Sequence, residues 1–135
     1  MTQPGDNPRS PLRLAATWYA IGAVMLLGVA VVSLVPVPDI GVSDKLSHLV
    51  TYFLLAGWFS LLAINRTRLG WTVIGLIAYG MLIELLQGIT SYRYPEWGDV
   101  LANGIGVLAG IVLYFSPLPR LFRSVDSRLA RLWLQ

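Results

Sequence analysis

Cysteine is absent from the sequence, which excludes a disulfide framework and any metal site built from thiolates. Charged residues are scarce: they make up 13% of the 135 residues, whereas soluble domains average about 25%. The sequence has a single histidine, which disfavours a zinc site. Apolar residues are abundant instead, at 56% of the chain with a mean hydropathy of +0.65. This is the composition of a membrane protein, and the length allows one domain at most.

Four apolar segments are candidates for crossing a bilayer, which takes about 20 residues of helix. The first has 22 residues without a charge and ends before two prolines. A signal peptide is the alternative for this segment. The segment is longer than a signal h-region of about 7–15 residues, however, and no small-x-small cleavage pattern follows it. The expected spans are residues 14–35, 46–64, 70–89 and 100–115.

We therefore expect an all-α membrane protein, with four transmembrane helices in a bundle and a C-terminal amphipathic surface helix. Residues 1–13 are polar and expected to be disordered, and residues 14–116 are expected to form the transmembrane domain. Residues 117–135 carry apolar positions at helical spacing and too many charges to span the membrane. We expect this basic helix to bind anionic phospholipid at the membrane surface. Its arginines are Arg120, Arg123, Arg128 and Arg131.

The distribution of lysine and arginine predicts the orientation of the chain. The N-terminus, the 65–69 loop and the C-terminal helix together carry eight of the ten basic residues. The positive-inside rule then places both termini in the cytoplasm and the loops 36–45 and 90–99 outside. The expected location is the cytoplasmic (inner) membrane of a bacterium. Nucleic acid is not an expected partner, because the basic residues flank apolar spans and do not alternate with aromatic residues.

With this orientation, polar residues of three predicted helices meet near the outer surface. Asp44, His48 and Tyr52 are spaced by four, so they lie along one helix face. Glu84 and Gln87 approach the same surface on the third helix. The candidate site consists of Asp44, Lys45, His48, Tyr52, Glu84, Gln87, Arg93, Asp99 and Asn103.

Structural roles are the alternative for several of these residues. Asp99 or Asp44 could cap a helix, and Asn103 could make one interhelical hydrogen bond. Glu84 is harder to explain in this way, because a carboxylate costs roughly 2.5–3.5 kcal/mol at the centre of a span. The small residues of the fourth helix predict close packing. The stripe expected to face the bundle is Ala102, Asn103, Gly106, Ala109 and Gly110, with Val107, Leu108, Ile111 and Val112 toward lipid or the first helix.

Three ordered motifs give the chain a family resemblance. They are D-K-x-x-H-x-x-x-Y from Asp44, E-x-x-Q from Glu84 and R-x5-D-x3-N-x2-G from Arg93. Together they resemble the VanZ-like membrane proteins, named after a protein associated with resistance to the glycopeptide teicoplanin. The resemblance covers residues 43–110 and implies a small multispanning domain. It is similar to a wider group proposed to act on phosphate linkages of lipids or lipid-linked envelope precursors. Antibiotic resistance is not carried over, because it depends on context that this chain does not contain.

Two functions of different classes follow. The first is an intramembrane lipid phosphoesterase or head-group transferase, with His48 as base or nucleophile and Asp44 or Glu84 orienting it. A hard cation such as Mg²⁺ would fit the excess of carboxylates, although the spacing requires none. The alternative is a non-catalytic lipid-binding or envelope-assembly protein. The oligomeric state does not follow from the sequence. The substrate-binding residues in either case are Lys45, Tyr52, Gln87, Arg93, Asp99 and Asn103.

Overall fold

The computed structural model describes residues 10–36, 43–90 and 96–133. Within these ranges the chain is helical and has no strand, which confirms the predicted all-α class. Four of the helical stretches are long and apolar enough to cross a membrane, as predicted. The elements are α1 (Ala15–Leu34), α2 (Asp44–Leu62), α3 (Arg66–Ile89), α4 (Trp97–Ile111), the 3-10 turn η1 (Val112–Phe115) and α5 (Leu118–Trp133).

Three of the helices, α2, α3 and α4, begin before the apolar segments that predicted them. α3 begins at Arg66, four residues before the expected span, because the side chain of Asn65 accepts a hydrogen bond from the Arg68 backbone at 2.8 Å. α2 and α4 likewise begin within polar sequence, at Asp44 and Trp97. Hydropathy marks the part of a helix that sits in hydrocarbon, whereas the helix itself continues to its cap. The predicted disorder of residues 1–13 falls largely outside the described residues.

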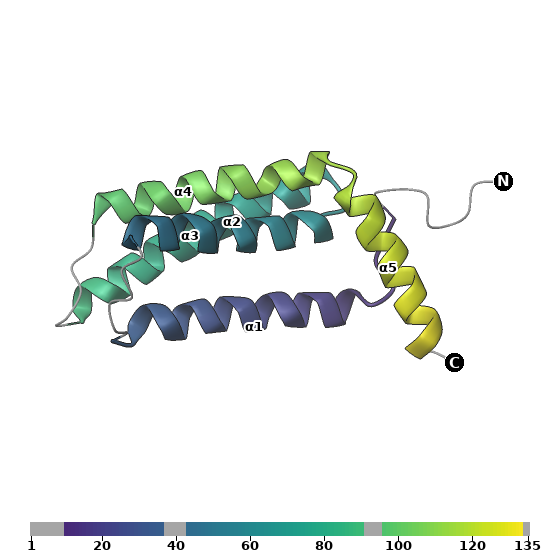
Figure 1. Ribbon diagram of the computed structural model, residues 1–135, viewed down its shortest axis with the longest axis horizontal. Helices are drawn as coiled ribbons and strands as arrows, with labels where there is room; N and C mark the ends of the chain where they lie inside the picture. The colour runs from purple at the N-terminus through teal and green to yellow at the C-terminus, as the bar shows by residue number, and fades with distance from the viewer. Residues whose placement is uncertain (1–9, 37–42, 91–95, 134–135) are drawn as a thin grey trace.

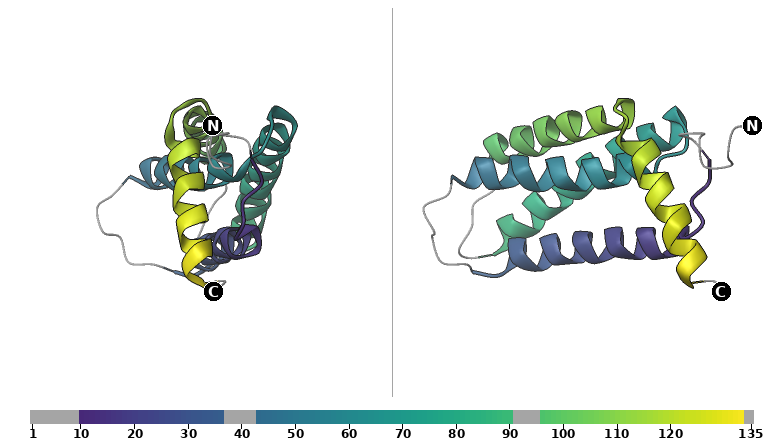
Figure 2. Two further views of the ribbon diagram at one scale, coloured as in Figure 1. Left: turned by 90° about the vertical axis from the view of Figure 1, so that its right-hand side faces the viewer. Right: turned by 45° about the vertical axis from the view of Figure 1, so that its right-hand side comes forward.

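Helices α1 to α4 run roughly alongside one another, and α5 crosses one end of the bundle (Figures 1 and 2). We call this end the α5 end. It contains the start of α1 and the ends of α2 and α4 (Figure 1). The opposite end contains the start of α2, the last turns of α3 and the start of α4 (Figure 1). We call it the polar end, for reasons given below.

The closest contact in the bundle joins α2 and α4. A Cβ atom added to Gly110 would lie 2.5 Å from the Phe53 carbonyl oxygen, and one added to Gly106 would collide with the backbone of Leu49. Real Cβ atoms do not approach backbone this closely. The two glycines therefore let the backbones of α2 and α4 touch, as the small-residue pattern predicts.

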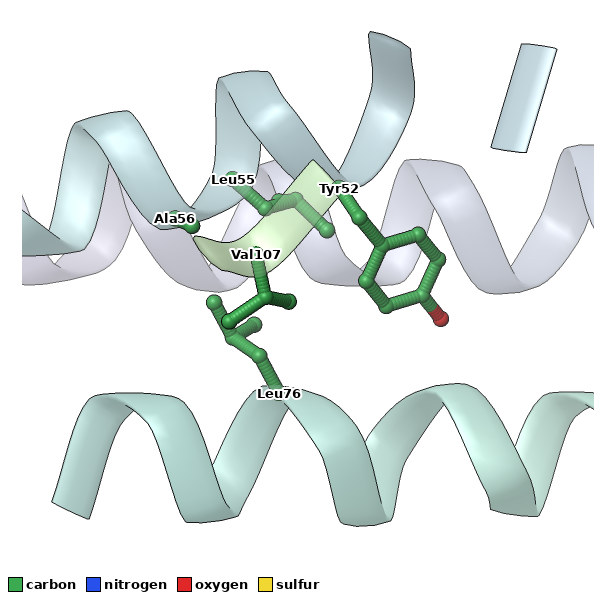
Figure 3. Close-up of a cluster of buried hydrophobic side chains, with 5 residues drawn as sticks. All are labelled: Tyr52, Leu55, Ala56, Leu76 and Val107. Atoms are coloured by element: carbon green, nitrogen blue, oxygen red, sulfur yellow. The ribbon is translucent and has the colours of Figure 1, made fainter. Parts of the chain in front are cut away.

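The buried face of α4 is turned slightly from the predicted one. Val107, expected to face lipid or the first helix, is fully buried, and Ala109, expected to face the bundle, is exposed. The reason is that α4 packs against α3 as well as α2, so its buried arc extends past Gly106 on that side. Figure 3 shows the result: Val107 lies between residues of α2 and α3. The cluster drawn there is Tyr52, Leu55, Ala56, Leu76 and Val107.

Helix α1 is attached along one edge and is mostly exposed. Its Gly22 lies under the ring of Phe59, and the Tyr79 hydroxyl donates to the Leu26 carbonyl at 2.6 Å. On the other side, Val24 and Leu27 expose 69% and 65% of their surface. Such a wide apolar face on a span is the surface expected to meet lipid tails.

Helix α5 joins the bundle through two buried charges. Arg123, which the sequence assigns to the lipid-binding basic face, is 1% exposed and donates to the carbonyl oxygens of Ser10, Leu61, Pro119 and Ala63 at 2.9–3.3 Å. Burial lowers the pKa of its guanidinium from the usual value. Asp126, also 1% exposed, accepts from the backbone of Arg13 and Leu14 and from the Trp18 indole at 2.7–2.9 Å.

These two side chains form hydrogen bonds with backbone groups at the ends of two helices. Arg123 binds carbonyl groups in the last turn of α2, and Asp126 binds amide groups at the first turn of α1. A cation at a helix C-terminus and an anion at a helix N-terminus also complement the helix dipoles. The predicted binding of α5 to phospholipid would then involve its exposed residues, which include Arg120, Arg128, Leu121 and Leu132.

Candidate functional site

The polar end brings together the side chains that the sequence predicts to meet. Five of them are buried although they are polar, and they come from α2, α3 and α4. Such residues are rare in spanning helices and mark functional sites when they cluster. They are His48, Glu84, Gln87, Asp99 and Asn103.

His48 is at the centre of the cluster. It is 8% exposed, and its Nδ1 atom lies 3.0 Å from the Asn103 side-chain oxygen and 3.6 Å from Oε1 of Glu84. An amide oxygen can only accept, so this bond requires the proton to be on Nδ1. In the neutral imidazole the other ring nitrogen, Nε2, then carries the lone pair; it lies 3.8 Å from Oδ1 of Asp44.

Glu84 reaches this place because α3 approaches the other helices closely at a glycine one turn earlier. A Cβ atom on Gly80 would lie 3.2 Å from both the ring of Tyr52 and the side-chain nitrogen of Asn103. Glu84 is 4% exposed and follows Gly80 by four residues, so it extends along the same helix face toward His48. Glu84 and His48, which the sequence predicts to share a site, therefore lie close together, with Oε1 3.6 Å from Nδ1.

Gln87 is buried on the same face of α3 but makes a different contact. Its side-chain nitrogen donates to the Ser33 carbonyl at 2.9 Å, near the end of α1. This bond satisfies a carbonyl in the last turn of a helix, where intrahelical partners are missing. Gln87 thus links α1 to α3.

Asp99 and Lys45 form the rim of the site together with Glu96, which the sequence analysis did not select. Lys45 Nζ lies 2.7 Å from Oε2 of Glu96 and 3.9 Å from Oδ1 of Asp99. Asp99 is 5% exposed, whereas the side chains of Lys45 and Glu96 are more than half exposed. The only clue to Glu96 in the sequence is a carboxylate four residues before an expected span. Arg93, predicted to bind substrate, lies outside the described residues.

The capping alternative does not explain the acidic residues here. The residues that precede α2 and α4, Ser43 and Glu96, make no side-chain capping hydrogen bond. Asp99 lies inside the first turn of α4 and not at its N-cap. Asp44 is the first residue of α2, where a negative charge is favourable but its side chain is half exposed.

Several buried polar atoms near His48 lack a hydrogen-bond partner among the described residues. They are the Tyr52 hydroxyl, Oδ1 of Asp99 and the side-chain nitrogen of Asn103. Most buried polar groups in proteins are hydrogen-bonded, and leaving one without a partner costs about 1–3 kcal/mol. Unsatisfied groups gathered beside a buried histidine are typical of a site that completes its bonding with a ligand.

The electrostatic balance of the site is strongly negative. Around His48 the described residues place the carboxylates of Asp44, Glu84, Glu96 and Asp99 against the ammonium of Lys45. Ligand atoms of Asp44, His48 and Asp99 lie within 4.8 Å of one another, so these three residues could hold a metal ion. No ion is part of the structure, and the fit of one is considered below.

Comparison with known proteins gives one result that bears on identity. The family model described as VanZ/LLP1 matches residues 13–123. Neither a curated protein nor a solved structure matches the chain. The matched region covers α2, α3, α4 and all the candidate site residues. With four apolar helices of spanning length and the family match over most of its length, the chain belongs to the VanZ/LLP1 family and is a membrane protein.

Proposed function

We propose that this protein acts on a phosphate linkage of a lipid, or of a lipid-linked envelope precursor, at the outer leaflet of the cytoplasmic membrane. The observation that supports this proposal most directly is the position of His48, which is buried between Glu84 and Asn103 on one side and Asp44 on the other. A histidine that faced lipid, or one far from Glu84, would have contradicted a catalytic role. The Nδ1 atom of His48 and Oε1 of Glu84 are 3.6 Å apart.

The tautomer of His48 supports a chemical role for its other nitrogen. Asn103 and Glu84 both offer acceptors to Nδ1, which keeps the proton there. The Nε2 lone pair is therefore the atom available to a ligand. In a phosphate-processing site such a lone pair has three uses: taking a proton from a nucleophile, attacking phosphorus, or binding a cation that holds the phosphate.

The location follows from charge and from the two ends of the bundle. Arg66, Arg68 and the exposed arginines of α5 lie at the α5 end, which the positive-inside rule assigns to the cytoplasm. The polar end then lies at the outer leaflet, at the level of phospholipid head groups. A lipid could place its phosphate beside His48 while its tails stay in hydrocarbon.

The orientation can be tested with single cysteines, since the chain has none of its own. Ser43 and Thr67 are both exposed, at opposite ends of the bundle. A membrane-impermeant maleimide should label Ser43→Cys in intact cells or spheroplasts, and should label Thr67→Cys only after the membrane is opened. The reverse pattern would place the site in the cytoplasmic leaflet.

The activity can be tested by mass spectrometry of lipids. Wild-type protein and the variants His48→Asn and Glu84→Gln are reconstituted in vesicles of bacterial total polar lipid extract. The wild type should convert at least one phosphate-bearing species over time, and both variants should lose this conversion. Leu108→Ala is the matched control, because Leu108 is 57% exposed on the outside of α4.

The same experiment separates an enzyme from a binding protein. If no lipid is converted, but one species co-purifies with the wild type and with His48→Asn alike, the protein is a lipid binder. If the variants convert lipid as fast as the wild type, His48 and Glu84 are not catalytic and the proposal fails.

A further inference from the structure

We propose that Asp44, His48 and Asp99 bind a divalent transition-metal ion, Zn²⁺ or Mn²⁺, at the polar end of the bundle. The ion would occupy the space between the Nε2 atom of His48 and the two carboxylates. Its role deepens the proposed function, since a metal ion is the charge that a phosphate needs at this site. Ion binding itself does not depend on that function and is tested separately.

The arrangement around His48 is the one that metal-binding histidines use. A histidine that ligates through one nitrogen almost always donates its other N–H to a carboxylate, carbonyl or similar acceptor, which fixes the ring. Here Nδ1 of His48 lies 3.0 Å from the Asn103 oxygen and 3.6 Å from the Glu84 carboxylate, which are the acceptors for its N–H group. Nε2 then directs a lone pair toward Oδ1 of Asp44 at 3.8 Å. In neutral His48 both atoms are acceptors, and a cation between them would bind to both.

Asp99 provides the independent sign that a ligand is expected. Its side chain is 93% buried, and its Oδ1 atom has no hydrogen-bond partner in the described part of the chain. The ammonium of Lys45 lies 3.9 Å from this atom, too far for a hydrogen bond, and is already paired with Glu96 at 2.7 Å. A buried carboxylate without a close partner is costly, and a metal ion would remove that cost.

The distances decide which ion fits. Bonds of about 2.0–2.2 Å to nitrogen and oxygen place the ligands of a tetrahedral Zn²⁺ ion about 3.4 Å apart. The three ligand atoms lie within 4.8 Å of one another, so binding would draw the more distant of them together by about 1 Å. A larger Ca²⁺ ion would need less movement, but Ca²⁺ and Mg²⁺ prefer all-oxygen sites. The imidazole therefore favours Zn²⁺, and the two carboxylates also suit Mn²⁺.

The ion would also resolve the charge problem of a phosphate site. Among the described residues, Asp44, Glu84, Glu96 and Asp99 contribute four formal negative charges against one positive charge from Lys45, a formal net of −3 with neutral His48. A phosphate would be repelled from such a site. A divalent ion held by three protein ligands keeps coordination positions open for water or phosphate oxygens. Asp44, with half of its side chain exposed, provides the entry from solution.

Binding can be measured with the metal alone. Purified protein in detergent is stripped with a chelator and titrated with ZnCl₂ or MnCl₂ by calorimetry. The wild type should bind one ion, and Asp99→Asn and His48→Gln should each bind at least about tenfold more weakly. The control is the double variant Lys45→Met/Glu96→Gln, which removes an ion pair and leaves the net charge unchanged. Its affinity should equal or exceed that of the wild type, because the ammonium no longer competes for Asp99.

A second measurement needs no variant. Bound Mn²⁺ should show magnetic coupling to one imidazole nitrogen in pulsed electron paramagnetic resonance. Absence of this coupling, absence of a bound ion in the wild type, or equal weakening by the double control would each overturn the proposal.

The two proposals fail in distinguishable ways. If the ion binds but no lipid is converted, the metal site stands and the phosphate activity does not. If lipid is converted at full rate in protein that a chelator has stripped of metal, the activity stands and the role of the ion in it is wrong, whereas the calorimetry alone decides whether the ion binds.

Discussion

Arg123 at the α5 end and His48 at the polar end are both buried, yet their surroundings are very different. Arg123 donates four hydrogen bonds to backbone carbonyls, and Asp126 beside it accepts three. His48 makes one hydrogen bond, and Oδ1 of Asp99 makes none within the described residues. A buried charge with its bonding complete holds the fold together. A buried charge with bonding left over is stable only if something else supplies the remainder.

The comparison predicts the largest loss of stability at the α5 end. Replacing Arg123 by methionine, of similar length, would leave the carbonyl groups of Leu61 and Ala63 without their donor and Asp126 without its neighbouring charge. We expect a loss of about 3 kcal/mol or more in the free energy of unfolding. Chemical denaturation in mixed micelles measures it, with Arg120→Met, on the exposed side of α5, as the control.

Replacing aspartate by asparagine should affect stability differently at the two ends of the bundle. Asp126→Asn exchanges one of the two accepting oxygens for an NH₂ group and should cost about 2–3 kcal/mol. Asp99→Asn removes an oxygen with no hydrogen bond and relieves repulsion among carboxylates, so the apo protein should be unchanged or slightly more stable. Equal losses at both positions would show that the polar end is a second structural clasp and not a ligand site.

A smaller loss of stability is expected from substitutions in the contact between α2 and α4. Gly106→Ala forces a methyl group against the backbone of α2 and should cost about 1–3 kcal/mol, as overpacking does. Gly104, on the same helix, has nothing within 4 Å of an added Cβ, so Gly104→Ala should be neutral or stabilising by up to about 1 kcal/mol. If the two melting temperatures change alike, the α2–α4 contact is looser than described here.

Tyr52→Phe is expected to have almost no effect on stability. The Tyr52 ring is part of the buried cluster, whereas its hydroxyl has no hydrogen-bond partner among the described residues. Removing the oxygen preserves the packing and should change the free energy of unfolding by less than about 0.5 kcal/mol. Loss of lipid conversion in this stable variant would identify the hydroxyl as a substrate contact. A melting temperature many degrees lower would reveal a structural bond instead.

The smallest effect on stability is expected at the rim of the site. Lys45 and Glu96 form a pair at 2.7 Å, but both side chains are more than half exposed. Exposed pairs contribute little and are screened by salt. Glu96→Gln should therefore leave the melting temperature unchanged, with and without 0.5 M salt added to the sample.

Local patterns were sufficient to predict much of this architecture. Hydropathy and length identified the four spanning helices, and a spacing of four placed Asp44 and His48 on one face. Motif order associated Glu84 and Asn103 with His48, and the structure brings all three into contact. Each of these features depends on residues near one another in sequence, or on the alternation of helix direction across a membrane.

The features that the sequence did not predict depend on tertiary neighbours. In the sequence Arg123 cannot be distinguished from the other arginines of a basic amphipathic helix. Only the structure shows that it binds carbonyl groups at the end of α2. Val107 is apolar, and composition alone cannot distinguish a lipid-facing valine from a buried one, since both surroundings are apolar. Glu96 precedes the apolar part of α4 and had no periodic pattern to select it. In a membrane protein, therefore, polarity locates the site better than it locates the core.

The bonding of α5 to α1 has a consequence for how the protein is made. Asp126 follows all four spans, and the amide groups that it binds, those of Arg13 and Leu14, emerge from the ribosome more than a hundred residues earlier. The first span must therefore enter the bilayer with its leading turn incomplete and wait until Asp126 has been translated. Chains that terminate before Asp126 would keep every transmembrane segment but lack this closure. Membrane proteases that recognise loose ends could use that difference to separate truncated chains from finished ones.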